Sequence, residues 1–145
     1  MLKGIHPLLS PDLLHAMATM GHGDSLAVVD ANFPAATVAR RLLEMRGAGA
    51  PAVLEAILTL FPVDTMAEPA VFTMQVVGDP GAVPAPVAEF AAILMAQGLA
   101  DVEIGSLERG AFYERAREAF AIVRTGELRP YGNILLVKGV VNHGV

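Results

Sequence analysis

The segment best suited to proton transfer is Gly21-His22-Gly23-Asp24, which joins a predicted helix to a predicted strand. The flanking glycines add no bulk beside His22, so its imidazole can be exposed in a cleft. An imidazole titrates near neutral pH, which suits it to act as a general acid and base. Asp24 is close enough in sequence for its carboxylate to bond one ring nitrogen and fix the tautomer. The alternative is a glycine-rich helix end in which His22 has no chemical role.

A second carboxylate, Asp30, follows the apolar run at residues 26–29, which predicts a buried strand. Ligands of open α/β sheets bind beyond the carboxyl ends of strands, so Asp30 is a candidate binding residue. An ordinary turn at the strand end is the alternative. Together with the His-x-Asp pair, Asp30 could also belong to a metal site. Zinc sites usually need three protein ligands, and the other three histidines lie at no motif spacing, so we predict no metal.

Recognition of hydroxyl groups is the chemistry indicated by Arg109 and by the triplet Tyr131-Gly132-Asn133. Arg109 precedes a predicted helix, where the positive end of the dipole disfavours a cation by roughly a few tenths of a kcal/mol. That placement indicates a role such as donating to ligand hydroxyls, with a surface ion pair as the alternative. The triplet offers a phenol, an amide and a glycine that permits close approach to the backbone. It would equally suit an ordinary turn.

Alternating helices and strands must position these residues. Ser10-Pro11-Asp12 predicts a helix start, with Ser as the N-cap, Pro at the first helical position and Asp near the positive end of the dipole; Gly21 ends this helix. The remaining pattern predicts helices at residues 51–60, 84–97 and 110–120, and strands at 26–29, 71–77, 102–104, 121–123 and 134–137. Such alternation implies an α/β sheet covered on both faces. With no repeat or linker, we expect a single domain, residues 1–145.

Composition and missing motifs limit the possible classes of protein. The net charge is −5 and the basic residues are scattered, which argues against nucleic-acid binding. The chain has no cysteine, so disulfides and thiolate chemistry are excluded. It contains no Gly-x-Ser-x-Gly elbow, Walker loop or His-Glu-x-x-His sequence, so nothing supports a hydrolase, nucleotide-binding or metalloprotease function.

The low charge content also bears on assembly and location. Charged residues make up 17% of the chain and hydrophobic residues 54%. Because charged residues are depleted at the cores of subunit interfaces, we expect a homo-oligomer. No window reaches about 18 uninterrupted apolar residues, and the start lacks the apolar region of a signal peptide. We therefore expect a cytoplasmic protein that does not enter a membrane.

Several segments taken together resemble a known bacterial family. They are LKGIHPLLSPDLLHAMATMGHGDSLAVVDANFP near the start, GAFYERAREAFAIVRTGE later and YGNILLVKGV near the end. The order GHGD, DANFP, FYERA, TGE and YGNILL is far more specific than any one of these motifs. On these residues the chain resembles the L-fucose mutarotase and D-ribose pyranase family.

The resemblance implies a three-layer α/β/α sandwich around a mixed sheet, with rings of subunits stacked into a decamer. It also implies a site shared between neighbouring subunits and a monosaccharide as substrate. His22 matches the catalytic histidine of the family, and Asp30 matches its substrate-binding aspartate. Arg109 matches the residue that contacts the sugar before the FYERA helix, and Tyr131, Gly132 and Asn133 match the sugar-binding triplet.

The implied reaction interconverts the α and β anomers of a free monosaccharide, L-fucose above all. His22 would protonate the ring oxygen while Asp24 orients it, and no cofactor is needed. Phe33 could cover the methyl group of the sugar. Fucose-type members share Arg109 and FYERA, whereas ribose-type members carry a histidine near Arg109 and Tyr-Ala-Asn in the triplet. Asn32 replaces the histidine common in fucose-type members, which leaves the choice of sugar open.

Three alternatives to a fucose mutarotase remain at this point. The first is a D-ribose pyranase, which interconverts pyranose and furanose rings. The second is a sugar-binding module without catalytic activity, against which an intact His22 is weak evidence. The third is a purely structural, ring-forming subunit, which would bind no ligand.

Overall fold

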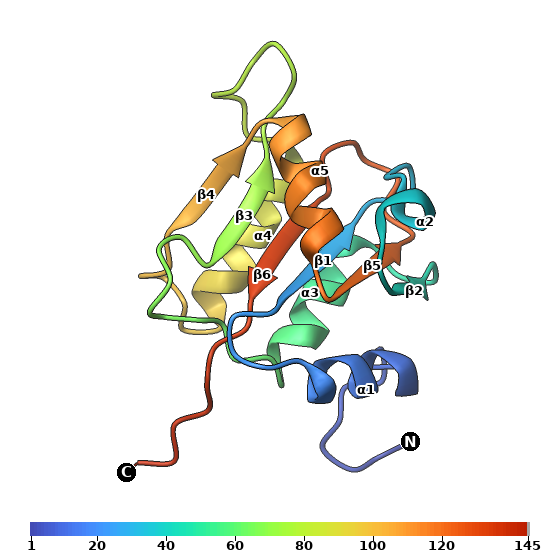
Figure 1. Ribbon diagram of the computed structural model, residues 1–145, viewed down its shortest axis with the longest axis vertical. Coiled ribbons are helices and arrows are strands. Elements are labelled where there is room, and N and C mark those ends of the chain that lie inside the picture. The colour runs from blue at the N-terminus through green and yellow to red at the C-terminus, as the bar shows by residue number, and fades with distance from the viewer. Residues whose placement is uncertain (145) are drawn as a thin grey trace.

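A six-stranded mixed sheet forms the centre of the computed structural model, which describes residues 1–144 (Figure 1). Its strands are β1 Ser25–Val29, β2 Leu42–Met45, β3 Val71–Met74, β4 Ile104–Leu107, β5 Ala121–Thr125 and β6 Ile134–Val137. They lie in the order β2-β5-β1-β6-β3-β4, and β6 runs antiparallel to both of its neighbours. Every residue of β3 and β6 is buried, as expected for central strands covered on both faces.

Five helices surround this sheet: α1 Pro11–Thr19, α2 Ala35–Val38, α3 Ala50–Leu58, α4 Ala85–Ala96 and α5 Arg109–Glu118. Helices α3 and α4 pack together behind the sheet in Figure 1, whereas α2 and α5 cover its front face. Helix α1 lies across the end of the sheet at which β1 begins. The predicted three-layer α/β/α arrangement around a mixed sheet is confirmed. None of these helices is long and apolar enough to span a membrane.

The predicted start of the first helix is confirmed in atomic detail. Ser10 Oγ accepts a hydrogen bond from the Leu13 backbone N–H at 3.2 Å, and Pro11 occupies the first helical turn, where its missing N–H is not needed. Leu13, Ala16 and Met17 form the buried face of α1. The packing of α1 therefore fixes the position at which the segment that contains His22 begins.

Two elements were not predicted, and one lies further along the chain than expected. Helix α2 and strand β2 were missed, and the strand predicted at residues 102–104 is β4, at 104–107. Strand β2 lies at the sheet edge and has no fully buried residue, so it lacks the apolar signal of a central strand. Its pairing with β5 is accompanied by an ion pair between Glu44 and Arg124, which depends on the tertiary fold.

The sheet has two ends that matter for function. At one end, which we call the Asp30 end, Asp30 follows β1, Met74 completes β3 and Asn133 precedes the antiparallel β6. At the opposite end, which we call the His22 end, His22 lies before β1 and Lys138 follows β6. Strand β1 has five residues, so at the usual rise per residue it separates the two ends by about 17 Å.

Candidate active site

A hollow of about 220 Å³ opens at the Asp30 end. It is lined by side chains from four separate stretches of the chain: Asp30, Asn32, Phe33, Met74, Arg109, Tyr113, Pro130, Tyr131 and Asn133. The structure thus brings together four residues that the sequence singled out as binding residues: Asp30, Arg109, Tyr131 and Asn133. Met74 and Pro130 were not predicted. Met74 is the last residue of the buried strand β3, and its place at a strand end could have marked it as a residue near the site.

Asp30 is the buried carboxylate of this hollow. Its side-chain Oδ1 accepts the backbone N–H of Asn32 at 3.0 Å, and its own backbone N–H donates to Asn133 Oδ1 at 2.9 Å. Burial raises the pKa of Asp30 above its ordinary value, although hydrogen bonds from Asn32, Phe33, Asn133 and Gly132 oppose that rise in part. A buried acceptor with a fixed position is well suited to bind a hydroxyl group.

Gly132 does not line the hollow, but close packing explains why this position has no side chain. A Cβ atom at Gly132 would lie 2.7 Å from Glu127 Cγ and 3.6 Å from Asp30 Cβ. A larger residue would therefore displace Glu127, whereas Asp30 would remain at an ordinary contact distance. The glycine allows the loop before β6 to pack closely against the buried side chain of Glu127.

Tyr131 is held in an uncommon backbone conformation. Its φ is 62°, in the left-handed region that residues other than glycine rarely adopt. Its hydroxyl oxygen accepts the backbone N–H of Val77 at 3.1 Å, which ties the loop before β6 to the loop after β3. A strained residue at the wall of a hollow is typical of a site in which the surrounding fold fixes a functional group.

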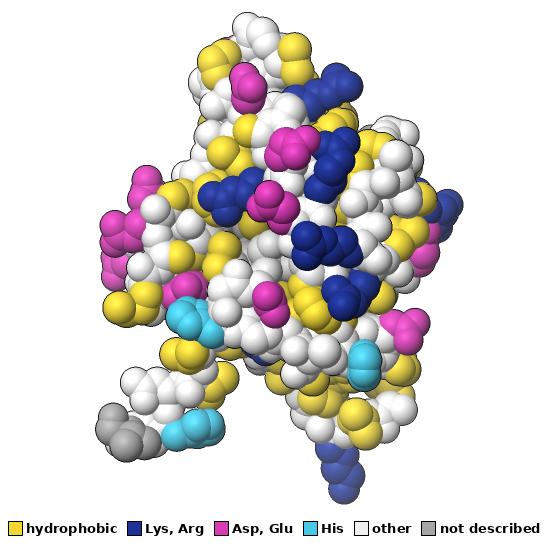
Figure 2. Space-filling model, viewed as in Figure 1, with side chains coloured by type: hydrophobic (Ala, Val, Ile, Leu, Met, Phe, Trp, Pro, Cys, Tyr) yellow, Lys and Arg dark blue, Asp and Glu magenta, His cyan; other side chains and the backbone are white. Residues whose placement is uncertain are grey.

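Arg109 is exposed at the start of α5, one residue earlier than the predicted helix start. Its guanidinium lies over the ring of Tyr113, 5.5 Å from the ring centre, and Tyr113 packs edge-on against Phe33 at 5.0 Å between ring centres. Figure 2 shows Lys and Arg side chains gathered over α5 on the viewed face. The hollow therefore has one wall of aromatic carbon with a cation beside it.

A buried carboxylate supports the loop at residues 126–133. Glu127 accepts the backbone N–H of Ala50 at 3.3 Å, at the start of α3, and the Nε–H of Arg129 at 2.7 Å. Arg129 also pairs with Glu89 of α4 at 2.7 Å. These bonds to Arg129 are the main reason that the pKa of Glu127 is held below its ordinary value. The loop that carries residues 131–133 is thereby attached to both α3 and α4.

His22 does not face this hollow. It lies at the His22 end, where its Nε2 is 3.1 Å from Asp64 Oδ2 and 54% of its side chain is exposed. The expectation that Asp24 bonds the imidazole is wrong, because Asp24 Oδ2 accepts the backbone N–H of Gly21 at 2.7 Å. Asp24 closes the turn through this short contact, whereas Asp64 reaches the imidazole from 42 residues away. The sequence around Asp64 offered no signal for this contact.

The described residues do not contradict the prediction of a site without metal. Within residues 1–144, no group of three or more His, Asp or Glu side chains is arranged to hold an ion. The groups described at the two ends of the sheet are the imidazole of His22, three buried carboxylates, Asp30, Asp64 and Glu127, and several neutral or cationic donors. The polar groups that line the hollow, Asp30, Arg109, Tyr131 and Asn133, are of the kind that binds a small molecule rich in hydroxyl groups.

Comparison with known proteins agrees with this class of site. The chain belongs to the RbsD / FucU transport protein family, whose family model matches residues 3–141. It is 45% identical over 143 residues to an L-fucose mutarotase of Actinobacillus pleuropneumoniae, covering 97% of each chain. The fucose mutarotase of Streptococcus pneumoniae, solved in complex with L-fucose, superposes with a TM-score of 0.92 at 39% identity, covering 97% of this chain and 100% of that one.

A ribose-binding relative is more distant in both sequence and structure. RbsD of Bacillus subtilis, solved in complex with D-ribose, is 25% identical and superposes with a TM-score of 0.72. The superposition covers 98% of this chain and 100% of that one. By both measures the chain is more similar to the fucose mutarotase of S. pneumoniae than to this ribose-binding protein.

Proposed function

We propose that this protein is an L-fucose mutarotase, an isomerase that interconverts the α and β anomers of the free sugar. The observation that carries the proposal is the hollow at the Asp30 end, which combines Asp30, Arg109, Tyr131 and Asn133 around a space of about 220 Å³. The 45% identity to an L-fucose mutarotase over nearly the whole chain supports the same reaction. The alternatives of a structural subunit and of a non-catalytic module are less well supported.

Each group in the hollow has a chemical task in this proposal. Asp30 accepts hydrogen bonds from sugar hydroxyls, and Arg109 donates to them with a planar fork that can span two neighbouring oxygens. Tyr131 and Asn133 provide further polar contacts, while Gly132 leaves room for Glu127, which supports the loop that carries them. Phe33, which lines the hollow next to Tyr113, offers apolar surface for the methyl group of fucose.

The distance between the two ends of the sheet favours a site made by two subunits. In one chain, β1 holds His22 about 17 Å from the hollow, too far to transfer a proton to a sugar bound there. We propose that His22 of a neighbouring subunit completes the site. The predicted homo-oligomer, a decamer of stacked rings, would supply such a neighbour, and we propose that it resides in the cytoplasm.

The proposed mechanism requires proton transfer and no cofactor. Protonated His22 donates its proton to the ring oxygen while water takes the proton of the anomeric hydroxyl, and the bond from C1 to the ring oxygen breaks. The open-chain aldehyde rotates about its C1–C2 bond, and the ring closes on the other face as both protons return. An imidazole can serve both directions because it titrates near neutral pH.

Saturation-transfer NMR between the α and β anomer signals tests the proposal. We expect faster anomer exchange on L-fucose than without protein, with weaker exchange on the analogue that lacks the methyl group, since one buried methyl contributes only about 1 kcal/mol. D-ribose should exchange little. Faster exchange on D-ribose than on L-fucose would instead establish a pyranase, and no effect on any sugar would establish a non-catalytic protein.

A further inference from the structure

We propose that Asp64 is a positioning residue that fixes the imidazole of His22, so that Nδ1 is the nitrogen that exchanges a proton with the sugar. This inference rests on the proposed catalytic role of His22. The contact that carries it is the 3.1 Å approach of His22 Nε2 to Asp64 Oδ2. Asp64 belongs to the segment between α3 and β3, which no sequence motif had connected with His22.

The carboxylate of Asp64 is itself held rigidly. Its side chain is 8% exposed, and its Oδ1 accepts the backbone N–H of Met66 at 2.8 Å. This backbone bond is the main cause that keeps the pKa of Asp64 below its ordinary value, and the bond to His22 acts in the same direction. Asp64 therefore carries a negative charge at neutral pH and can only accept a hydrogen bond, so His22 Nε2 must be the donor.

The segments that carry the two side chains are joined through the end of β6. Gly23 N–H donates to the Lys138 carbonyl and Lys138 N–H donates to the Asp24 carbonyl, both at 2.8 Å. On the other side, Asp64 N–H donates to the Val137 carbonyl at 2.9 Å. These backbone bonds hold both segments against the same end of the sheet. The contact between imidazole and carboxylate is thus built into the sheet and does not depend on a flexible loop.

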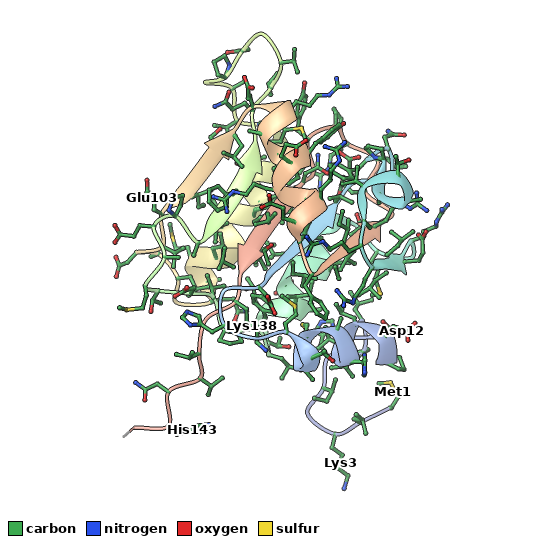
Figure 3. The ribbon with its side chains drawn as sticks, in the orientation of Figure 1. Met1, Lys3, Asp12, Glu103, Lys138 and His143 are labelled. Carbon is green, nitrogen blue, oxygen red and sulfur yellow. The ribbon has the colours of Figure 1, made fainter. Side chains whose placement is uncertain are left out.

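The two residues that follow β6, Lys138 and Gly139, also hold the end of α1 and the Asp64 segment in position. The Lys138 ammonium donates to the carbonyls of Met17 and Met20 at 2.8 and 2.6 Å, at the end of α1 just before the His22 segment (Figure 3). A Cβ atom at Gly139 would lie 2.8 Å from the Asp64 Cα, so this position must remain small for the Asp64 segment to pack there. Helix α1 and the Asp64 segment are therefore both packed against the residues that follow β6.

This arrangement has a definite consequence for proton transfer. Because Nε2–H points to Asp64, the other nitrogen, Nδ1, is free to face a sugar. In the imidazolium, Nδ1–H gives its proton to the ring oxygen and leaves a neutral ring that still carries Nε2–H. When the ring of the sugar closes, Nδ1 takes the proton back. Carboxylates that orient metal-bound histidines typically contribute about 10–100-fold to activity, and we expect a similar contribution from Asp64.

An Asp64→Asn variant gives the sharpest test, because it keeps the shape of the side chain. The amide oxygen can still accept the Met66 N–H, which turns the amide NH₂ toward His22 Nε2. A donor at that position can pair only with an unprotonated Nε2, so the neutral imidazole must shift its proton to Nδ1. NMR of protein with ¹⁵N-labelled histidine should detect Nε2–H in the unmodified protein and Nδ1–H in the variant.

The kinetic expectations separate positioning from a general structural role. At saturating L-fucose, Asp64→Asn and Asp64→Ala should lower kcat by about 10–100-fold, with KM nearly unchanged. Adding Asp64→Ala to His22→Ala should cause little further loss, because the two residues act as one unit. The control is Glu103→Gln, which removes a neighbouring exposed charge from the hollow beside Asp64 and should leave kcat unchanged.

The outcomes also separate this inference from the proposed function. An inactive His22→Ala together with a fully active Asp64→Asn that keeps Nε2–H would overturn the role of Asp64 alone. Full anomer exchange by a folded His22→Ala protein would overturn the catalytic role of His22, and the role of Asp64 with it. Circular dichroism and sedimentation of each variant verify that the fold and the assembly are retained.

Discussion

The two ends of the sheet are built on different principles. At the Asp30 end, side chains from four stretches of the chain converge on a hollow, and burial raises the pKa of its carboxylate. At the His22 end, one exposed imidazole is held by one buried carboxylate, whose pKa is lowered. The first arrangement suits recognition of many hydroxyl groups, whereas the second suits transfer of a single proton.

This difference explains why the proposed reaction needs groups from both ends of the sheet. The Asp30 end has polar groups suited to bind hydroxyls but no imidazole among the residues that line its hollow. The His22 end has an imidazole, and the hollow beside its carboxylate is lined by the acidic residues Asp64, Glu68, Asp101 and Glu103. In the proposed function, a second subunit joins the two ends in one site.

Mixing two inactive variants should produce the largest effect. His22→Ala homo-oligomers should lose about 10²–10⁴ of the exchange rate on L-fucose, the usual contribution of an acid–base group. Asp30→Ala homo-oligomers should also lose most of their exchange, because the sugar hydroxyls lose their buried acceptor. In oligomers assembled from equal amounts of both variants, random pairing leaves about a quarter of the sites with an intact His22 and an intact Asp30. Co-expression with two different tags, followed by NMR of the doubly purified oligomer, measures this recovery.

The control for the mixing experiment is an oligomer made from two differently tagged copies of His22→Ala. It should remain inactive, since every site lacks the imidazole. A mixed oligomer as inactive as its parents would contradict a site shared between subunits. It would leave His22 and Asp30 of the same chain as partners and require a rearrangement that shortens the distance between the two ends.

Substitution of Arg109 tests the division of roles between the two ends, because it should weaken sugar binding and leave proton transfer intact. Arg109→Ala should raise KM for L-fucose about 10- to 100-fold, the loss expected when hydrogen bonds from a charged donor disappear. The expected change in kcat is much smaller. Arg109→His should recover little affinity, since a histidine lacks the planar fork of donors. A large fall in kcat at unchanged KM would instead assign Arg109 to the chemical step.

A pH titration should produce the smallest effect. The carboxylate of Asp30 is the form that accepts sugar hydroxyls, and burial raises its pKa. Affinity for L-fucose should therefore be complete above that raised pKa and decrease as the pH falls through it, beginning at a higher pH than an ordinary aspartate would cause. Titration of sugar binding by NMR from neutral pH to about 4.5 measures the decrease. In Asp30→Asn, affinity should be lower throughout and lose this pH dependence.

Much of the fold could be predicted because its signals are local. The N-cap at Ser10 and the apolar run of β1 are each defined by neighbouring residues, and both appear where expected. Helix α2 and strand β2 were missed because α2 is one turn long and β2 is a half-exposed edge strand. Such elements are stabilised by the neighbours that they pack against, which a local pattern does not contain.

The sequence by itself determined which residue types were available for chemistry and which elements would carry them. It placed Asp30 at the end of a buried strand and His22 in a turn between a helix and a strand. Only the tertiary structure decided which groups meet. The strand order places Asp64 rather than Asp24 against His22, and it brings Tyr131 and Asn133 to the end of β1 that carries Asp30. Helix and strand signals act over a few residues, whereas these contacts depend on how strands far apart in the chain are ordered.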